Sequence, residues 1–192
     1  MEITAAQSEL RNAYAHGGPG TLISGILWMA AATTQLYAGT STGFAVLFFG
    51  GMFLFPATKL VLSICFRRPS ESRENHGGLV VIETVFPMIG GLFAAWLLLP
   101  QRPEFVFSVA AIAVGAHYFG FSTAYGDWTF WVLGAIMCSV GVAAILFAFP
   151  PHNTVGFAIA GVEVAFGCWF LWTDFKATQI DSAHPTPEET FE

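Results

Sequence analysis

Long apolar segments separated by short turns dominate the sequence. A helix needs about 20 mostly apolar residues to cross the roughly 30 Å hydrocarbon core of a bilayer. Six segments meet this requirement: 20–37, 43–66, 78–99, 103–124, 127–149 and 152–175. Because the connections are short and rich in glycine, proline and asparagine, we expect consecutive helices to form antiparallel hairpins. The predicted fold class is all-α: a polytopic membrane protein, a bundle of six transmembrane helices.

The composition agrees with a lipid environment. Of the 192 residues, 55% are hydrophobic and only 10% are charged, whereas about a quarter of the residues in a soluble domain are charged. Much of the net charge of -6 comes from the acidic stretch after Asp181, so it says little about partners. The sequence has no basic stripe, which argues against nucleic acid as a ligand. The expected partner of most of the surface is the lipid bilayer.

The two ends of the chain differ from its apolar centre. Residues 1–19 form the predicted cytoplasmic N-terminal segment, in which Thr4 is a candidate N-cap of a short surface helix. The first apolar run is too long for a signal-peptide core, and the only A-x-A sequence, Ala13–Tyr14–Ala15, precedes it. We therefore expect a retained span. Residues 20–175 form the predicted membrane domain, and 176–192 a disordered acidic cytoplasmic tail.

Basic residues indicate the orientation. The loop after the second segment contains Arg67, Arg68 and Arg73, and such residues favour the cytoplasmic side. Six spans then place both termini in the cytoplasm, and only Arg102 falls on the opposite side. Short motifs for catalysis, such as HExxH and GxSxG, are absent from the sequence. We expect no catalytic residue and no cofactor.

The three cysteines give no sign of a disulfide framework or a zinc site. Cys65, Cys138 and Cys168 are odd in number and have no CxxC spacing. We interpret them as small buried apolar residues and predict no metal site.

Ionisable residues inside the apolar segments are the strongest functional signal. Each costs about 2.5 to 3.5 kcal/mol at a helix centre on insertion scales, so such residues usually face other helices or a wet cavity. The candidates are Lys59, Glu83, His117 and Glu163. The last three share helical stripes with small residues, which allow membrane helices to approach closely. These stripes are Ala110, Ala113, Gly120 and Ala124 around His117; Gly156, Ala160 and Gly167 around Glu163; and Pro87, Gly90 and Ala94 after Glu83.

Depth groups the same four residues. With a rise of about 1.5 Å per residue, Glu83 lies about 7 Å from the cytoplasmic end of its helix and Glu163 about 16 Å. Lys59 and His117 fall between them, at about 10 Å. We therefore predict a polar cavity in the inner half of the bilayer. Pro56 and Pro87 lie inside the second and third spans and are expected to kink them.

Each residue also has a structural interpretation. Lys59 can extend to the interface along its aliphatic stem, and Glu83 can stabilise the first turn of its helix. His117 can hydrogen-bond a neighbouring helix as a neutral imidazole. Glu163 is the hardest to explain structurally, because a carboxyl group near the midplane must be protonated, paired or hydrated.

Two short stretches carry a family resemblance. Gly115–Ala116–His117–Tyr118 with Phe121 forms a GAHY-x-x-F motif, and Phe49–Gly50–Gly51–Met52 continues to Pro56. The sequence resembles a family of small multi-pass bacterial membrane proteins of unknown function. The resemblance implies a location in the bacterial inner membrane and marks His117 and Tyr118 for attention. The candidate polar cavity thus comprises Lys59, Glu83, His117, Tyr118 and Glu163.

Two functions from different classes remain open. The first is a transporter-like or small-molecule-binding membrane protein whose site exchanges protons, because His117 can change charge near neutral pH. The second is a structural or regulatory protein that acts through a partner, in which the polar residues only join helices; a homo-oligomer is included here. An intramembrane enzyme is a third and weaker interpretation, so the sequence predicts a protein that is not an enzyme.

Overall fold

The computed structural model describes residues 2–183, with side chains described up to residue 179, and this part of the chain is all α. A short helix, α1 (Ile3–Ala13), comes first. The helices of the bundle follow: α2 (Gly18–Ala38), α3 (Thr40–Met52), α4 (Leu54–Val61), α5 (Gly77–Leu98), α6 (Val106–Tyr125), α7 (Thr129–Phe147) and α8 (Val155–Ala183). Short helical turns connect them: η1 (Ala15–Gly17), η2 (Leu62–Phe66), η3 (Pro103–Phe105) and η4 (His152–Thr154).

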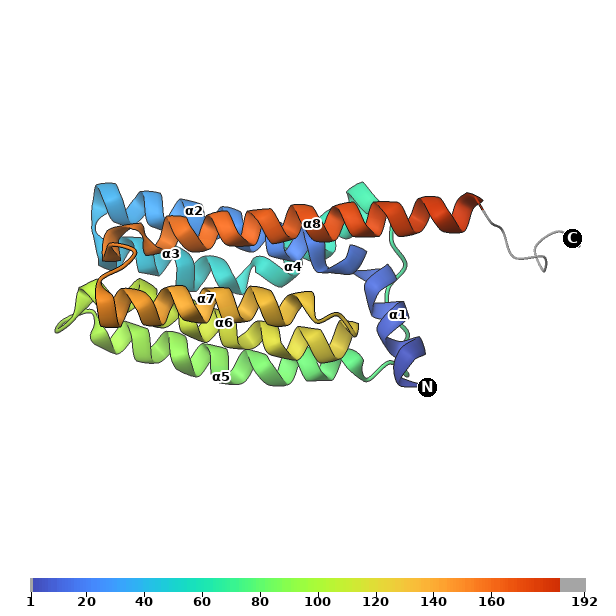
Figure 1. The fold of residues 1–192 in the computed structure, drawn as a ribbon, viewed down its shortest axis with the longest axis horizontal. Coiled ribbons are helices and arrows are strands. Elements are labelled where there is room, and N and C mark those ends of the chain that lie inside the picture. Colours follow the sequence, from blue (N-terminus) through green and yellow to red (C-terminus); the bar gives the residue numbers. More distant parts are fainter. Residues whose placement is uncertain (1, 184–192) are drawn as a thin grey trace, which may run out of the picture.

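Six helical passes lie side by side along the long axis of the molecule, with α3, α4 and η2 forming one of them (Figure 1). Each pass coincides with one of the six predicted apolar segments to within a few residues, except that α8 continues beyond residue 175 to Ala183. α1 lies across the end of the bundle at which the chain starts and α8 ends (Figure 1). The predicted short turns and antiparallel hairpins are therefore present.

The lengths and apolarity of the helices are those of a membrane protein, but they do not establish six crossings. Four helical segments within residues 2–183 are long and apolar enough to cross a bilayer: Gly77–Leu98, Pro103–Tyr125, Thr129–Phe147 and His152–Gln179. The bent pair Thr40–Met52 and Leu54–Phe66 counts as a fifth if it is one span. α2 contains glycine, threonine and glutamine among its apolar residues, which lowers its mean hydropathy and leaves it outside this set.

The bend between α3 and α4 has a local cause. The two helices meet at 53° around Phe53. Pro56 cannot donate a backbone hydrogen bond to Met52, and its ring displaces the carbonyl one turn earlier. The predicted kink in the second pass is therefore present. By contrast, α5 continues through Pro87 as one helix.

Glycine and alanine allow close helix packing along α2 and α8. A Cβ atom on Gly25 would lie 2.9 Å from a methyl carbon of Val164, and one on Gly167 would lie 2.7 Å from Leu22. α6 and α7 approach in the same way, where Gly115 and Gly134 face each other's backbone. The predicted inward orientation of the stripe around Glu163 is thus confirmed, and Glu163 is completely buried.

Two predictions about the chain ends need correction. The N-terminal helix is present, but Glu2 occupies its N-cap position and Thr4 lies inside the helix. Residues 176–183 continue α8 instead of starting a disordered tail, because nothing before Pro185 interrupts the helical pattern. Residues 184–192 of the predicted tail lie outside the described part of the chain.

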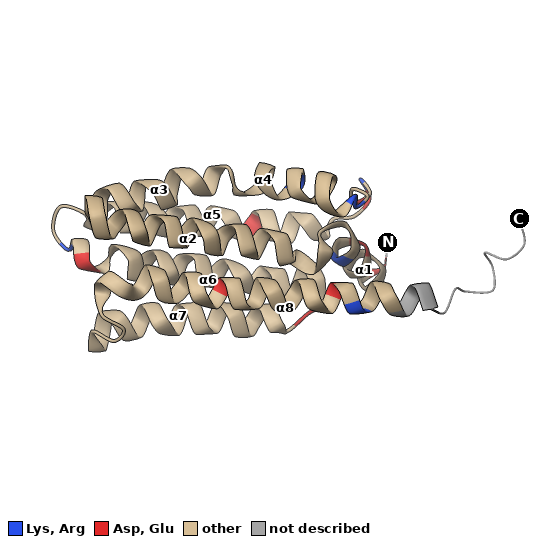
Figure 2. Cartoon of the chain, turned by 90° about the horizontal axis from the view of Figure 1, so that it is seen from above, with Lys and Arg blue, Asp and Glu red and all other residues tan. Residues whose placement is uncertain are grey.

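Charged residues gather at the two ends of the bundle (Figure 2). The exceptions within the helical passes include acidic positions on α5 and α8, which are Glu83 and Glu163. Much of the remaining outer surface consists of exposed large apolar side chains, among them Ile26, Phe86, Leu97 and Leu146. Such a surface fits lipid as its solvent.

Candidate functional site

A cavity of about 500 Å³ lies beneath α1, bounded by α2, α4, α5 and α6. Its wall is mostly apolar and includes Leu54, Phe55, Val85, Phe86, Ile89 and Phe121. The polar members of the wall are Tyr14, Thr21, Thr58, Glu71, Tyr118 and Tyr125. The volume and this mixture of many apolar and few polar groups are typical of small-molecule sites.

Tyr118 connects the cavity to the most deeply buried carboxyl group. Its hydroxyl donates a hydrogen bond of 2.9 Å to Oε1 of Glu163. Glu163 does not line the cavity, and its Oε2 atom is buried without a hydrogen-bond partner among the described residues. Thr21 and Ser24 of α2, both buried, lie close to this pair. The wall of the cavity therefore has a fixed phenol in front of a buried acid.

A second polar cluster joins the rim of the cavity to the loop after η2. Glu71 accepts hydrogen bonds from Lys59 (2.8 Å) and from the hydroxyl of Tyr14 (2.7 Å). The Lys59 ammonium also lies 4.2 Å from the centre of the Tyr14 ring. Partial burial opposes ionisation of Glu71, but the hydrogen bonds from Lys59 and Tyr14 outweigh it and lower its pKa. The alternative in which Lys59 reaches the interface agrees with this geometry.

His117 is held outside the cavity wall. The Thr84 hydroxyl donates to the carbonyl of Val81 (2.7 Å) and lies 2.6 Å from Nδ1 of His117. Because the Thr84 hydroxyl has one proton and donates it to the Val81 carbonyl, the Nδ1–H group of His117 donates to the Thr84 oxygen. The contact joins α5 to α6, as the structural interpretation of His117 expected.

Glu83 points away from the bundle. It is exposed and has no hydrogen-bond or ion-pair partner in the part of the chain that the structure describes. Pro87, Gly90 and Ala94 of its stripe are exposed too, and a Cβ atom on Gly90 would meet nothing within 4 Å. The prediction that this stripe packs inward is wrong, because α5 uses its opposite face, with Gly91 against Ala113, to pack on α6.

The five predicted residues therefore do not form one cavity. Only Tyr118 lines the cavity, and Glu163 acts on it through that residue. Lys59 reaches the rim through Glu71, whereas His117 and Glu83 lie elsewhere. The predicted orientation holds for Glu163, which is completely buried, and fails for Glu83, which is exposed.

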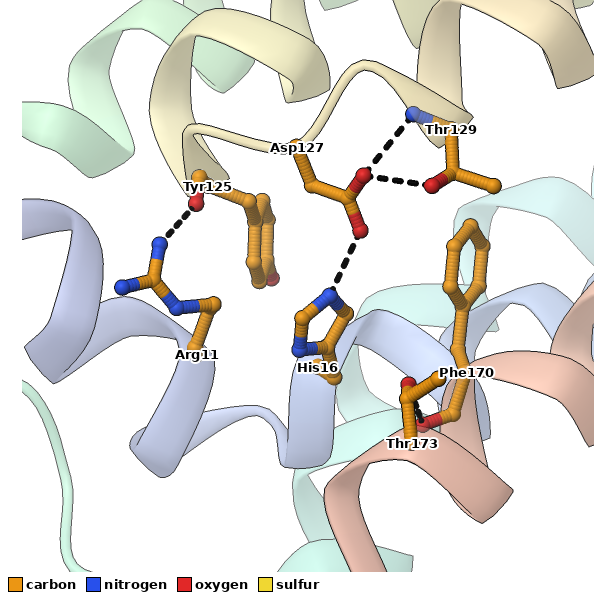
Figure 3. Close-up of polar contacts among 7 residues, drawn as sticks. All are labelled: Arg11, His16, Tyr125, Asp127, Thr129, Phe170 and Thr173. Atoms are coloured by element: carbon orange, nitrogen blue, oxygen red, sulfur yellow. Dashed lines mark hydrogen bonds and ion pairs between the residues drawn. The ribbon is translucent and has the colours of Figure 1, made fainter. Parts of the chain in front are cut away.

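A polar contact at the same end of the bundle was not predicted from the sequence (Figure 3). Nε2 of His16 lies 2.7 Å from Oδ2 of Asp127, and Oδ1 of Asp127 accepts from the backbone N–H (2.8 Å) and hydroxyl (2.5 Å) of Thr129. Phe170 stacks on the His16 ring at 5.9 Å between ring centres. Burial disfavours the Asp127 carboxylate, but the hydrogen bonds from His16 and Thr129 prevail and lower its pKa to about 2.

This contact anchors the start of α2 to the turn between α6 and α7. Arg11 also donates to the carbonyl of Tyr125 in that turn (Figure 3). The signal available in the sequence was Asp127 two residues before Thr129, a spacing typical of a side chain that caps the following helix. Its partner on the distant N-terminal segment had no such signal.

The described residues contain no cluster of three or more histidine, cysteine or acidic side chains that could hold a metal ion.

Comparison with known proteins gives a family but no activity. No curated protein and no solved structure matches the chain. The model of a family of unknown function, DUF7010, matches residues 3–173. The match covers the whole helical bundle up to the last turns of α8. The chain therefore belongs to the DUF7010 family.

Proposed function

We propose that the protein is an integral membrane protein that binds a small molecule in the cavity beneath α1. The observation that carries the proposal is the position of Tyr118, whose side chain lines an otherwise mainly apolar cavity and whose hydroxyl is fixed by the buried Glu163. A buried polar pair is expensive in a membrane protein and marks a functional site by default. A helix contact alone would not require an adjoining cavity.

The proposal includes the membrane topology. Six crossings place α1, the arginine-containing loop, the α6–α7 turn and the end of α8 on one side, and the basic residues of that loop favour the cytoplasm. The bilayer is that of a bacterial inner membrane. α2 completes the set of six because it packs along α8 over much of its length.

Binding agrees with the geometry better than a continuous channel does. The half of the bundle farther from α1 contains the aromatic side chains Trp28, Phe44 and Phe107, which are buried and contact one another. None of these three residues lines the cavity, and their packed rings leave no described opening through that half of the bundle. We therefore propose a binding site accessible from the cytoplasmic side or the inner leaflet, in a protein that is not an enzyme.

A cavity-filling variant tests this function. With 4-phenylbutanol as the probe, we expect saturable binding of one equivalent to wild type in phosphatidylcholine nanodiscs, after subtraction of protein-free discs. Val85→Trp and Ile89→Trp place a large side chain in the cavity wall and should abolish the saturable component. Leu146→Trp is the matched control, because Leu146 is 66% exposed on α7. Equal binding by wild type and both filled variants, each melting like wild type, would rule the cavity out as the site.

The outer face of α5 supports a second candidate function. Glu83 is exposed there, has no partner among the described residues and lies beside Pro87, Gly90 and Ala94. A protein that acts structurally or as a regulator through another membrane helix would use such a face. Cysteine cross-linking from Gly90→Cys to a stoichiometric partner or to a second copy would favour this function. If Gly90→Cys cross-links no more than the control Leu146→Cys, this function is ruled out.

A further inference from the structure

The polar atoms of the cavity wall are mostly hydrogen-bond acceptors. Five side chains that carry a hydroxyl group line the cavity, and four of these hydroxyl groups already donate to the protein. Thr21 donates to the carbonyl of Gly17 (3.1 Å) and Thr58 to that of Leu54 (2.8 Å). Tyr14 donates to Glu71, and Tyr118 to Glu163. Each of these oxygens can still accept, whereas only Tyr125 has a donor without a partner among the described residues.

The wall also contains aromatic faces that favour a cation. The rings of Tyr118, Phe121 and Tyr125 line the cavity, and aromatic faces attract cations. The charged side chain in the wall, Glu71, forms an ion pair with Lys59, which does not line the cavity.

From this arrangement we infer that the cavity takes a lipophilic amine, with the protonated amino group at the hydroxyl oxygens of Thr21, Thr58 and Tyr118 and the apolar body between α4 and α5. This inference rests on the proposed function. An alkylammonium group has three N–H donors and no acceptor, which complements a wall whose donors are used within the protein. A carboxylate of the same size would meet acceptors and carboxyl groups instead.

The route of entry follows from the exposed part of the wall. Phe55 of α4 is 60% exposed, and Phe86 and Ile82 of α5 are 71% and 55% exposed. These three side chains line the cavity and are exposed, so its wall between α4 and α5 is open to the surroundings of the bundle. An amphiphile whose apolar body partitions into the inner leaflet enters between α4 and α5.

Glu163 is a positioning residue in this scheme. It does not touch the ligand, but it accepts the hydrogen bond that the Tyr118 hydroxyl donates, which leaves the phenolic oxygen only its acceptor role. Glu163→Gln preserves an acceptor for Tyr118 and should keep the amine preference. Glu163→Leu frees the hydroxyl to donate into the cavity and should shift the preference towards the alcohol.

Three probes with one apolar body test the inference: 4-phenylbutylamine, 4-phenylbutanol and 4-phenylbutanoate, at pH 7 in phosphatidylcholine nanodiscs. The saturable binding that Val85→Trp removes is compared between the probes. We expect the amine to bind at least about tenfold more tightly than the other two, as a charge-assisted hydrogen bond would give. Tyr118→Phe should reduce that preference several-fold, whereas Tyr37→Phe, at an 84% exposed position, should not.

The outcomes separate the two proposals. If the alcohol or the carboxylate binds as tightly as the amine and Val85→Trp still removes the binding, the ligand class is wrong and the cavity remains the site. If neither Val85→Trp nor Ile89→Trp changes the binding of any probe, the proposed function fails together with the inference.

Discussion

At the scale of single residues, the buried pair of Tyr118 and Glu163 distinguishes this bundle from one held together by apolar packing alone. A carboxyl group with one unpaired oxygen in a completely buried position is unfavourable unless something else retains it. The neighbouring cavity provides such a reason, because the pair fixes the direction in which the Tyr118 hydroxyl acts.

A double-mutant cycle measures the coupling free energy between Tyr118 and Glu163. Tyr118→Phe and Glu163→Leu each remove one partner, and we expect a coupling free energy of unfolding of about 0.5 to 1.5 kcal/mol, as for hydrogen bonds between membrane helices. The cycle is measured by reversible unfolding in detergent micelles. Tyr37→Phe combined with Glu163→Leu is the control and should be additive. Additivity in the Tyr118 cycle as well would mean that the bond contributes nothing.

Asp127 makes the stability depend on pH. Its pKa of about 2 lies below the value of about 3.9 for an unfolded chain, so its contribution is present above pH 4 and is lost as the pH falls towards 2. Asp127→Ala should lower the free energy of unfolding by about 1 to 2 kcal/mol at pH 7. The difference from wild type should shrink between pH 4 and pH 2.

Melting curves of both proteins at several pH values check this prediction. Glu104→Ala is the control, since its ion pair with Arg102 is exposed and such pairs contribute little. A difference between wild type and Asp127→Ala that is the same at pH 3 and pH 7 would show that the carboxylate charge is not responsible.

At the scale of elements, α1 lies over the cavity at the end of the bundle where the chain starts. Glu9 accepts hydrogen bonds from the backbone N–H of Ser72 (2.7 Å) and from the amide of Asn75 (2.6 Å). On the other side, Gln7 donates to the carbonyl of Thr123 (2.9 Å). α1 is thus held between the loop before α5 and the end of α6, with Leu10 in the cavity wall.

Removing the carboxylate of Glu9 should loosen this cap. We expect Glu9→Ala to increase amide hydrogen exchange in α1 about tenfold, because the hydrogen bonds of the Glu9 carboxylate with Ser72 and Asn75 are lost. Exchange in α7 should stay unchanged. Glu2→Ala, at an exposed residue before α1, should behave like wild type. If Glu9→Ala leaves the exchange of α1 unaltered, the loop contacts do not hold the cap.

The same elements show what the sequence could predict. The six helical passes were located to within a few residues, because the length of an apolar run and the turn residues at its ends are local properties. The rotation of α5 was not predictable from small residues alone: Gly90 and Gly91 are equally small, yet Gly91 packs on Ala113 and Gly90 is exposed. Tertiary contacts between distant segments, such as His16 with Asp127, had no local signal at all.

At the scale of the whole molecule, every proposal depends on one arrangement of the bundle in the bilayer. The cavity, its rim and α1 belong to the end where the chain starts and α8 ends (Figure 1). Six crossings, with that end in the cytoplasm, give a ligand access from the inner leaflet. Four or five crossings would place α2 or the bent pass of α3 and α4 differently and would separate the walls of the cavity.

The most direct test of this arrangement is labelling of single cysteines in intact bacterial cells with a membrane-impermeant maleimide. The background replaces Cys65, Cys138 and Cys168 by serine, and one cysteine is added at Gly39, Arg102, Asn153, Ser70 or Asp127. We predict labelling of the first three positions in intact cells, and of Ser70→Cys and Asp127→Cys only after the membrane is permeabilised. Labelling of Ser70→Cys in intact cells, or of Gly39→Cys only after permeabilisation, would contradict the six-span arrangement on which the account depends.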